Sequence, residues 1–287
     1  MTDPGARPRS ITIYSHNRPA DSAEALRRIV ELAGEADVEV RLPASEEEKF
    51  GLPQGAVRAW GDPEEGDLAV VLGGDGTILT RLRALSDTRV PVFAINFGAI
   101  GFLATVEPSE LDEGFRRALA GELDVMELPG LVAAAPGGDE LAVNDVSFHR
   151  RQSGRVAELA YSVEGEQLGE VRCDGLVVST PAGSTGYNLA NGGPVLAWGV
   201  EGYIVSFIAP HTLTARTLVV APDDSLKVTN RSDEDEVDVT TDGQAICTLA
   251  PAASMPIRFE HSRVLLAQSP GATFYHRLRD KFGRLSF

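Results

Sequence analysis

The sequence of 287 residues, 43% of them hydrophobic, is long enough for two ordinary domains with their own cores. No segment approaches the roughly 20 consecutive apolar residues that cross a bilayer, so we expect no membrane partner. The net charge of −16 argues against nucleic acids and anionic membrane surfaces as partners, because both bind clustered positive charge.

The two cysteines, Cys173 and Cys247, are too few and too far apart for a disulfide framework or a zinc site. Residues 1–10 lack the apolar stretch of a signal peptide. Both features favour a cytoplasmic location. The five histidines show no metal-ligand spacing, and none lies beside a candidate nucleophile in the sequence: His16, His149, His211, His261 and His276. We interpret His211 as structural.

Strand and helix patterns alternate over the first 125 or so residues. Short apolar runs that predict strands occupy residues 11–16, 38–42, 67–72 and 91–96. Helical spacing of apolar residues lies between or after them, at 22–33, 77–85 and 109–120. Ser109 and Asp112 have the spacing of a capping box at the start of the last helix. This alternation is typical of a parallel sheet covered by helices.

The pattern changes after residues 128–130, where strand-like runs follow one another with turn residues between them. One helix is predicted, over residues 184–190. The predicted strands are 141–149, 158–164, 175–180, 203–209, 217–220, 225–229, 237–241 and 257–259. Because helices are scarce here, we predict a mainly antiparallel β domain.

The last segment, 273–282, returns to helical spacing, with Phe274, Leu278 and Phe282 on one face. We expect this helix to pack back on the first domain. The sequence therefore predicts an α/β fold with a Rossmann-like parallel-sheet domain over 1–125, joined by 270–287. A β-rich domain is predicted over 126–269.

A glycine-rich loop follows the predicted strand at 67–72, with the sequence Gly73-Gly74-Asp75-Gly76-Thr77. Glycines allow a close backbone approach, and the N–H groups at the start of the next helix form a site for phosphates. An aspartate at such a site is unusual unless it binds Mg²⁺ or handles a proton. The structural alternative is a glycine turn in which Asp75 caps the helix.

A second loop, rich in small and hydroxyl residues, follows the predicted strand at 175–180 and leads into the helix at 184–190. Asp174 could accept a hydrogen bond from a sugar hydroxyl or an adenine amine, and Arg172 could bind a phosphate. A tight strand-to-helix connection is the alternative interpretation.

Two shorter segments are less specific. Asn144 could recognise an amide or an adenine edge, and Asp145 could accept from a ribose hydroxyl, although Asn-Asp is more often a turn or bulge. Asp242-Gly243-Gln244 has the Asp-Gly signature of a hairpin turn.

Together these segments resemble the NAD kinase family. The matching stretches, in order along the chain, are 73–77, 96–103, Asn144-Asp145, 174–187 with 192–194, and 242–244. Lipid kinases of the diacylglycerol type share the glycine loop, whereas the long segment from Asp174 to Tyr187 is more specific. A lipid kinase and a non-catalytic dinucleotide sensor remain the alternatives.

The resemblance implies transfer of a phosphoryl group from ATP to the 2′-hydroxyl of the adenosine ribose of NAD, with Asp75 as the catalytic base. It implies Mg²⁺ and a homodimer or homotetramer, and it leaves inorganic polyphosphate open as a donor. Donor phosphates would contact Gly73, Gly74, Gly76 and Thr77. NAD would contact Asp75, Gly76, Asn144, Asp145, Arg155, Arg172, Asp174, Thr185, Gly186, Tyr187, Asn188, Leu189, Ala190 and Gln244. No metal ligand is assigned.

The chain departs from the family pattern at several of these positions. Asp145 is one methylene shorter than the usual glutamate, and Ala182 lacks the hydroxyl of the usual threonine. Gly186 stands where alanine is common, and Phe97 and Ile100 stand where leucine is common. None of these differences changes Asp75.

Overall fold

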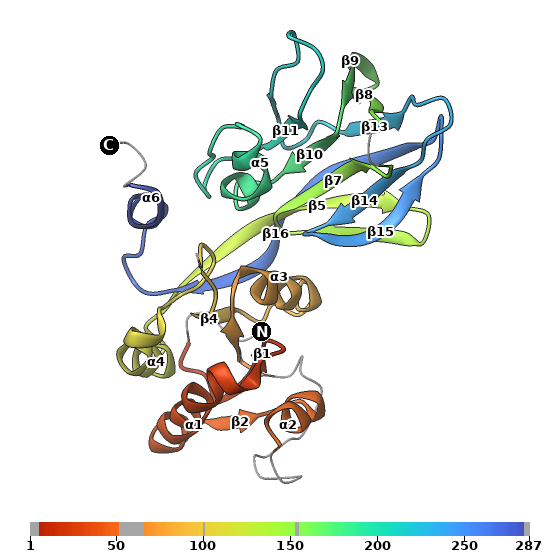
Figure 1. The fold of residues 1–287 in the computed structure, drawn as a ribbon. Coiled ribbons are helices and arrows are strands. Elements are labelled where there is room, and N and C mark those ends of the chain that lie inside the picture. Colours follow the sequence, from red (N-terminus) through yellow and green to blue (C-terminus); the bar gives the residue numbers. More distant parts are fainter. Residues whose placement is uncertain (1–5, 52–65, 100, 153–154, 284–287) are drawn as a thin grey trace. The chain divides into compact units, whose positions relative to one another are not determined.

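The chain divides into two compact units, one formed by Met1–Glu127 with Val264–Phe287 and the other by Leu128–Arg263. The computed structural model describes residues 6–51, 66–99, 101–152 and 155–283 (Figure 1). Ile100, part of the family resemblance, lies outside the described residues.

The first unit is built on a parallel sheet in the order β2-β1-β3-β4, with the end of β16 beside β4. All residues of β1, β3 and β4 are buried, which explains the mainly apolar character of β3 and β4, whereas β1 also buries Ser10, Thr12 and Ser15. The strands are β1 (Ser10–Ser15), β2 (Glu39–Arg41), β3 (Leu68–Gly73), β4 (Val92–Asn96) and β16 (Ser254–Gln268), which begins in the second unit.

Helices cover this sheet, as Figure 1 shows for α1 to α4. Helix α1 buries Leu26, Ile29 and Leu32 at helical spacing, and α3 packs on β3 and β4. The helices are α1 (Pro19–Glu35), α2 (Ala44–Phe50), α3 (Asp75–Ala84), α4 (Leu111–Leu119) and α6 (Phe274–Phe282). The C-terminal helix α6 belongs to this unit, as the sequence predicted.

The predicted capping box of Ser109 and Asp112 is wrong. A 3₁₀ turn, Pro108–Glu110, precedes α4, and Glu107 and Glu110 form the capping box instead. The chain therefore begins to coil at Pro108, whose fixed φ suits the first position of a helix.

The second unit contains a six-stranded antiparallel sheet in the order β12-β11-β10-β7-β14-β15. The first part of β16 pairs with β13, followed by β8 and β9, and all these pairs are antiparallel. Strands β5 (Asp124–Ala135, beginning in the first unit) and β6 (Gly138–Ala142) form a hairpin. The other strands are β7 (Asp145–Arg150), β8 (Ala157–Val163), β9 (Glu166–Cys173), β10 (Gly175–Ser179), β11 (Tyr203–Ile208), β12 (Leu218–Val220), β13 (Leu226–Asn230), β14 (Val237–Thr241) and β15 (Gln244–Leu249).

One hydrophobic core in this unit takes residues from both groups of strands. Phe148 and Leu176 come from the six-stranded sheet, and Leu159 and Val228 come from the other strands. The fold class predicted from sequence, a parallel α/β part and a mainly antiparallel β part, is confirmed.

The predicted helix over 184–190 is shorter and is interrupted. A 3₁₀ turn covers Gly183–Thr185, and α5 covers only Tyr187–Ala190. Gly186 separates them with a φ of −95° and a ψ of −123°, which is not helical, so the peptide N–H groups cannot form one continuous helical ladder there.

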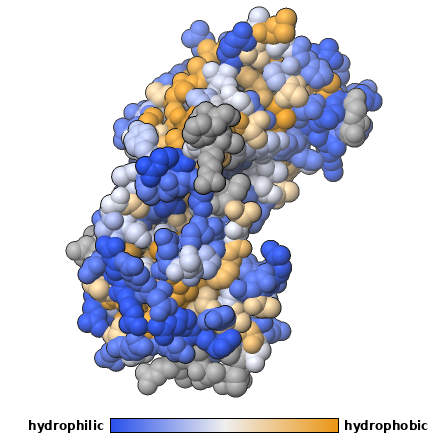
Figure 2. Space-filling view, turned by 60° about the vertical axis from the view of Figure 1, so that its left-hand side comes forward, coloured by the Kyte–Doolittle hydropathy of each residue, from blue (hydrophilic) through white to orange (hydrophobic). Residues whose placement is uncertain are grey.

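The surface agrees with the composition. Hydrophilic residues predominate on the face shown in Figure 2, with hydrophobic residues interspersed among them. Within the described parts of the chain, no helix is long and apolar enough to cross a membrane.

Candidate active site

The glycine loop of the first unit connects buried β3 to the start of α3. Thr77 fills the space beside Gly73, where an added Cβ would lie 2.7 Å from the Thr77 Cβ and Oγ1. Helix α3 begins directly after Gly74, and the N–H groups of Asp75 and Gly76 in its first turn precede the first bonds of the helix. The N–H of Thr77 bonds to the Gly74 carbonyl at 2.9 Å. Gly73, Gly74, Gly76 and Thr77 thus lie together at a helix N-terminus, the arrangement that suits an anion.

A second glycine loop, after β4, touches the first one at the backbone. Gly73 and Asn96 are partners at the ends of the adjacent parallel strands β3 and β4. A Cβ added at Gly98 would lie 2.8 Å from the Cα of Gly74. Gly101 has a φ of +63°, and a Cβ there would overlap the side-chain amide of Asn96. The glycines allow the two loops to lie this close.

The Asp75 side chain points to the second loop rather than to its own helix. Its Oδ2 accepts the backbone N–H of Phe102 at 2.9 Å, and its Oδ1 accepts the N–H of Leu103 at 3.1 Å. Gly74 is the N-cap residue of α3, so the interpretation of Asp75 as a simple helix cap is wrong. An ionised carboxylate offers about four acceptor positions, so two N–H groups leave capacity for a hydroxyl.

In the second unit, Asp242 organises the segment that contains Asn144 and Asp145. Its carboxylate accepts the backbone N–H groups of Val143 (3.0 Å), Asn144 (2.7 Å) and Asp145 (3.1 Å). Asp242 and Gly243 both have positive φ and form a two-residue turn between β14 and β15, as the sequence predicted. The contacts of this carboxylate cannot be predicted from the sequence, because they join residues almost a hundred positions apart.

Asp145 is buried at the start of β7, with 7% of its surface exposed. Burial, followed by the negative charge of Asp242, raises the pKa of Asp145 to about 7. This carboxyl group therefore changes its protonation state near neutral pH, and it can donate or accept a hydrogen bond with a polar ligand.

The hydroxyl-rich loop after β10 packs on Asn144. The Thr180 hydroxyl donates to the Val143 carbonyl at 2.6 Å and accepts the N–H of Gly183 at 3.0 Å. A Cβ added at Gly183 would lie 2.1 Å from the Asn144 carbonyl oxygen, so only glycine fits. The Oδ1 of Asn144 is buried and has no hydrogen-bond partner among the described residues.

The loop brings Tyr187 to the same place as Asp145 and Asp174. Burial raises the pKa of Tyr187, and the charges of Asp145 and Asp174 add to the increase. Asp174 forms an ion pair with Arg150 at 3.1 Å. An exposed aromatic ring beside two carboxylates can stack on a planar ring while the acids bind hydroxyl or amine groups.

His149, to which the sequence assigned no functional role, stacks on Tyr187 with ring centroids 5.7 Å apart. Its Nε2 lies 2.8 Å from the Ser147 hydroxyl, and burial lowers its pKa. Its position two residues after Ser147 on β7 places both on one face of the strand. Sequence analysis missed this contact, because Tyr187 belongs to a separate loop.

The other predicted NAD contacts of this unit are spread more widely. Thr185 bonds to the carbonyl of Ala182, and Asn188 is fully buried and bonds to Ser184 and Pro194. Leu189 is half-buried, whereas Gly186, Ala190 and Gln244 are exposed. Asn188 thus holds the loop together, and the exposed residues are accessible to a ligand.

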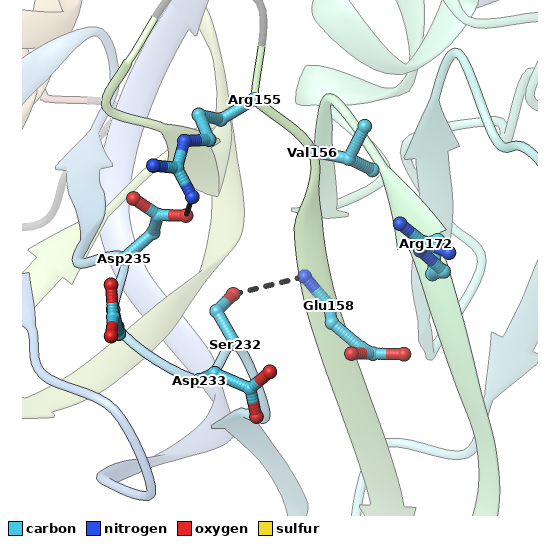
Figure 3. A pocket seen from close by; sticks show the side chains of 8 residues that line it. Arg155, Val156, Glu158, Arg172, Ser232, Asp233 and Asp235 are labelled. Atoms are coloured by element: carbon cyan, nitrogen blue, oxygen red, sulfur yellow. Dashed lines mark hydrogen bonds and ion pairs between the residues drawn. The ribbon is translucent and has the colours of Figure 1, made fainter.

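Arg155 and Arg172 lie around a separate cavity of about 400 Å³, drawn in Figure 3. Arg155 pairs with Asp235 at 3.4 Å, and Arg172 lies opposite Glu158 in the pairing of β8 and β9. Acidic residues outnumber the two arginines in the lining, which consists of Arg155, Val156, Glu158, Arg172, Ser232, Asp233, Glu234 and Asp235. Asp145 and Tyr187 do not line this cavity. Arg150, which pairs with Asp174, also donates to the Arg155 carbonyl at 3.0 Å, so one side chain connects Arg155 to Asp174.

Acidic, histidine and cysteine side chains in the described ranges form no group of three that could hold a metal ion. Mg²⁺ often binds through one or two carboxylates plus the phosphates of a substrate, and the Asp75 carboxylate beside the glycine loop fits that mode.

Comparison with family models gives two matches. Residues 59–123 match the ATP-NAD kinase N-terminal domain, and residues 143–266 match the ATP-NAD kinase C-terminal domain. The first range contains the glycine loop, and the second contains Tyr187 together with Asp145, His149 and Asp174.

Curated relatives are similar over most of their length. An NAD kinase of Gemmatimonas aurantiaca is 36% identical over 225 residues, which are 76% of this chain and 77% of the relative. An NAD kinase of Methylibium petroleiphilum is 34% identical over 271 residues, 91% of this chain and 89% of the relative.

Two solved structures have the same fold. An NAD kinase from Archaeoglobus fulgidus in complex with ATP has a TM-score of 0.74 and 27% identity, covering 96% of this chain and 98% of that one. A yeast NADH kinase complexed with NADH has a TM-score of 0.83, covering 97% and 88%. At 21% identity, this second likeness concerns the fold alone.

Proposed function

We propose a residue-level account of how this chain, which belongs to the NAD kinase family, phosphorylates NAD to NADP. The observation that carries it is the Asp75 carboxylate, fixed by two backbone N–H groups at the end of a phosphate-binding loop.

In the reaction, the bond between the terminal phosphorus of ATP and its bridging oxygen breaks, and ADP leaves. A new bond forms from that phosphorus to the 2′-oxygen of the adenosine ribose of NAD. Phosphoryl transfer has a loose transition state, so alignment of the hydroxyl matters more than strong basicity. Asp75 orients the 2′-hydroxyl and accepts its proton late in the step. The proton then passes from the carboxyl group to solvent.

The donor phosphates are held by the backbone around Gly73, Gly74, Gly76 and Thr77. The N-terminus of α3 supplies N–H groups and a favourable dipole. Mg²⁺ bound with the donor phosphates would neutralise part of their charge. Because a backbone site recognises phosphate rather than a nucleoside, we propose that polyphosphate also serves as a donor. Rates with the two donors at equal phosphoryl concentration test this, and no turnover with polyphosphate would contradict it.

NAD binds in the second unit through the cluster around Tyr187. The Tyr187 ring stacks on a planar group of NAD, while Asn144, Asp145 and Asp174 bind polar groups of NAD. Thr185, Gly186, Leu189, Ala190 and Gln244 extend this site. For Arg155 and Arg172 the prediction rests on the family resemblance, since acids surround both in the described structure.

Purified protein with Mg²⁺, ATP and NAD should yield NADP, measured with an NADP-specific dehydrogenase, while diacylglycerol stays unphosphorylated. Lipid phosphorylation without NADP formation would show a lipid kinase. Binding of NAD with no turnover would show a dinucleotide sensor. Light scattering after gel filtration tests the homodimer or homotetramer that the resemblance implies.

A further inference from the structure

The C-terminal helix α6 contacts the loop that holds Asp75. Arg277 donates to the Phe102 carbonyl at 2.7 Å, and the same guanidinium donates to the Ala104 carbonyl and to the Gln268 side chain. The N–H groups of Phe102 and Leu103 are those that bond to Asp75. Two hydrogen bonds and one peptide unit therefore separate Arg277 from the carboxylate.

Aromatic packing fixes the same loop from the same helix. The ring of Phe102 lies between Phe274 and Phe282, at centroid distances of 5.9 and 5.8 Å. These two residues stand at the two ends of α6. The Phe102 side chain is therefore held along the helix while Arg277 holds its carbonyl.

A second cation of α6 holds the far end of the loop. Lys281, one turn after Arg277, donates to the Glu107 carboxylate at 2.7 Å. Glu107 also accepts from the Asn96 side chain at 3.0 and 3.1 Å, and Asn96 accepts the N–H of Gly98. Residues at both ends of the segment 102–107 therefore bond to side chains of α6: Phe102 to Arg277, and Glu107 to Lys281.

The charge environment is consistent with this arrangement. Burial lowers the pKa of Arg277, and the negative charges of Asp75 and Glu107 oppose that change. A guanidinium donates in a fixed planar geometry, so it can hold several carbonyl groups at once. A lysine at this place could reach them with less geometric control.

We propose that Arg277 is a positioning residue for phosphoryl transfer: through the 102–104 backbone it fixes the Asp75 carboxylate at the reacting hydroxyl. The role rests on the proposed function of Asp75. It assigns to the last helix, some two hundred residues away, part of the alignment at the glycine loop.

The test compares Arg277→Ala, Arg277→Lys and Arg277→Gln with Arg279→Ala. Arg279 is the matched control, since it lies on the same helix, is exposed, and contacts Asp280 and His276. For each variant we would measure kcat, KM and Kd for NAD, and Tm.

We expect kcat of Arg277→Ala to fall by roughly 10- to 100-fold, since small misplacements of a reacting group have effects of this size. Its Kd for NAD should stay within about threefold, because only transition-state alignment is lost. Arg277→Lys should recover part of kcat, and Arg279→Ala should behave as the wild type. Should Arg277→Ala unfold at the assay temperature, Arg277→Gln carries the same comparison, because it keeps the stem and an N–H donor.

Equal kcat for the folded Arg277 variants and Arg279→Ala would overturn the positioning role. A loss of kcat that only follows the folded fraction would overturn it as well. A wild-type chain that makes no NADP would instead refute the proposed function, so the two failures are distinguishable.

Discussion

Asp145 is buried beside Asp242, whose carboxylate accepts the Asp145 backbone N–H at 3.1 Å. Two acids are therefore held together where the proposed NAD site begins. Burial first, and the Asp242 charge second, raise the pKa of Asp145 to about 7. The folded chain thus binds a proton that the unfolded chain releases near the ordinary aspartate pKa of about 3.9.

This pairing predicts how stability depends on pH. Because the folded pKa is raised, the group's favourable contribution is complete below about pH 4 and is lost as pH rises to about 7. Asn has no group that ionises in this range, so Asp145→Asn should not lose this stability as the pH rises. At pH 8 it should be more stable than the wild type, by about 4 kcal/mol at most.

Urea unfolding between pH 4 and pH 8 measures the effect. The stability difference between Asp145→Asn and the wild type should grow up to about pH 7 and then stay constant. Asp223→Asn, in an exposed turn, is the control. A difference that does not change with pH would contradict the assignment.

Asp242 should be needed for the shape of the Asn144-Asp145 segment. In Asp242→Asn, an amide group replaces one acceptor oxygen and faces a backbone N–H, so we expect a loss of about 1–3 kcal/mol in stability. The affinity for NAD should fall as well. Asparagine tolerates the positive φ of 46°, so the turn itself should persist. Thr248→Ala, at an exposed position of β15, is the control, and unchanged stability and NAD affinity in Asp242→Asn would contradict this role.

In Gly183→Ala, the added methyl group should overlap with neighbouring backbone atoms and so distort the proposed NAD site. The added Cβ would meet the Asn144 carbonyl oxygen at 2.1 Å, so the loop or β7 must move. Overpacking of this kind typically costs about 1–3 kcal/mol. We expect a lower Tm and a weaker Kd for NAD. Gly199→Ala adds the same methyl group where no atom lies within 4 Å, and equal behaviour of the two variants would refute the prediction.

The features that the sequence predicted are those set by neighbouring residues. Alternation of apolar strands and amphipathic helices predicted the parallel sheet, and the Asp-Gly pair predicted the turn at 242–243. The sequence predicts strand β16 only over 257–259, although this range includes Arg258, because Glu260 and Arg263 interrupt the apolar pattern that follows. These charges form ion pairs: Arg258 pairs with Asp139 and Glu260, and Arg263 pairs with Glu260.

Contacts between distant residues could not be predicted in this way. The acceptors of the N–H groups at Phe102 and Asn144 are Asp75 and Asp242, which are 27 and 98 positions away. Motif resemblance singled out Asp75, but the hydrogen bonds of its carboxylate depend on how the loops after β3 and β4 pack. The hydrogen bond from Arg277 to that loop depends on how α6 packs against it.

The most direct test of the account is the turnover of Asp75→Asn. Asparagine keeps one acceptor for the N–H groups of Phe102 and Leu103, so the loop should stay near its place with a modest loss of Tm. The variant cannot accept the proton of the ribose hydroxyl. Glu113→Gln, an exposed charge change on α4, is the control.

We would measure kcat, Tm and the Kd for NAD on the same preparations. The account predicts a folded protein that binds NAD and turns over about 10²- to 10⁴-fold more slowly than the wild type, the usual range for loss of a general base. Turnover near the wild-type rate in a folded Asp75→Asn variant would contradict it.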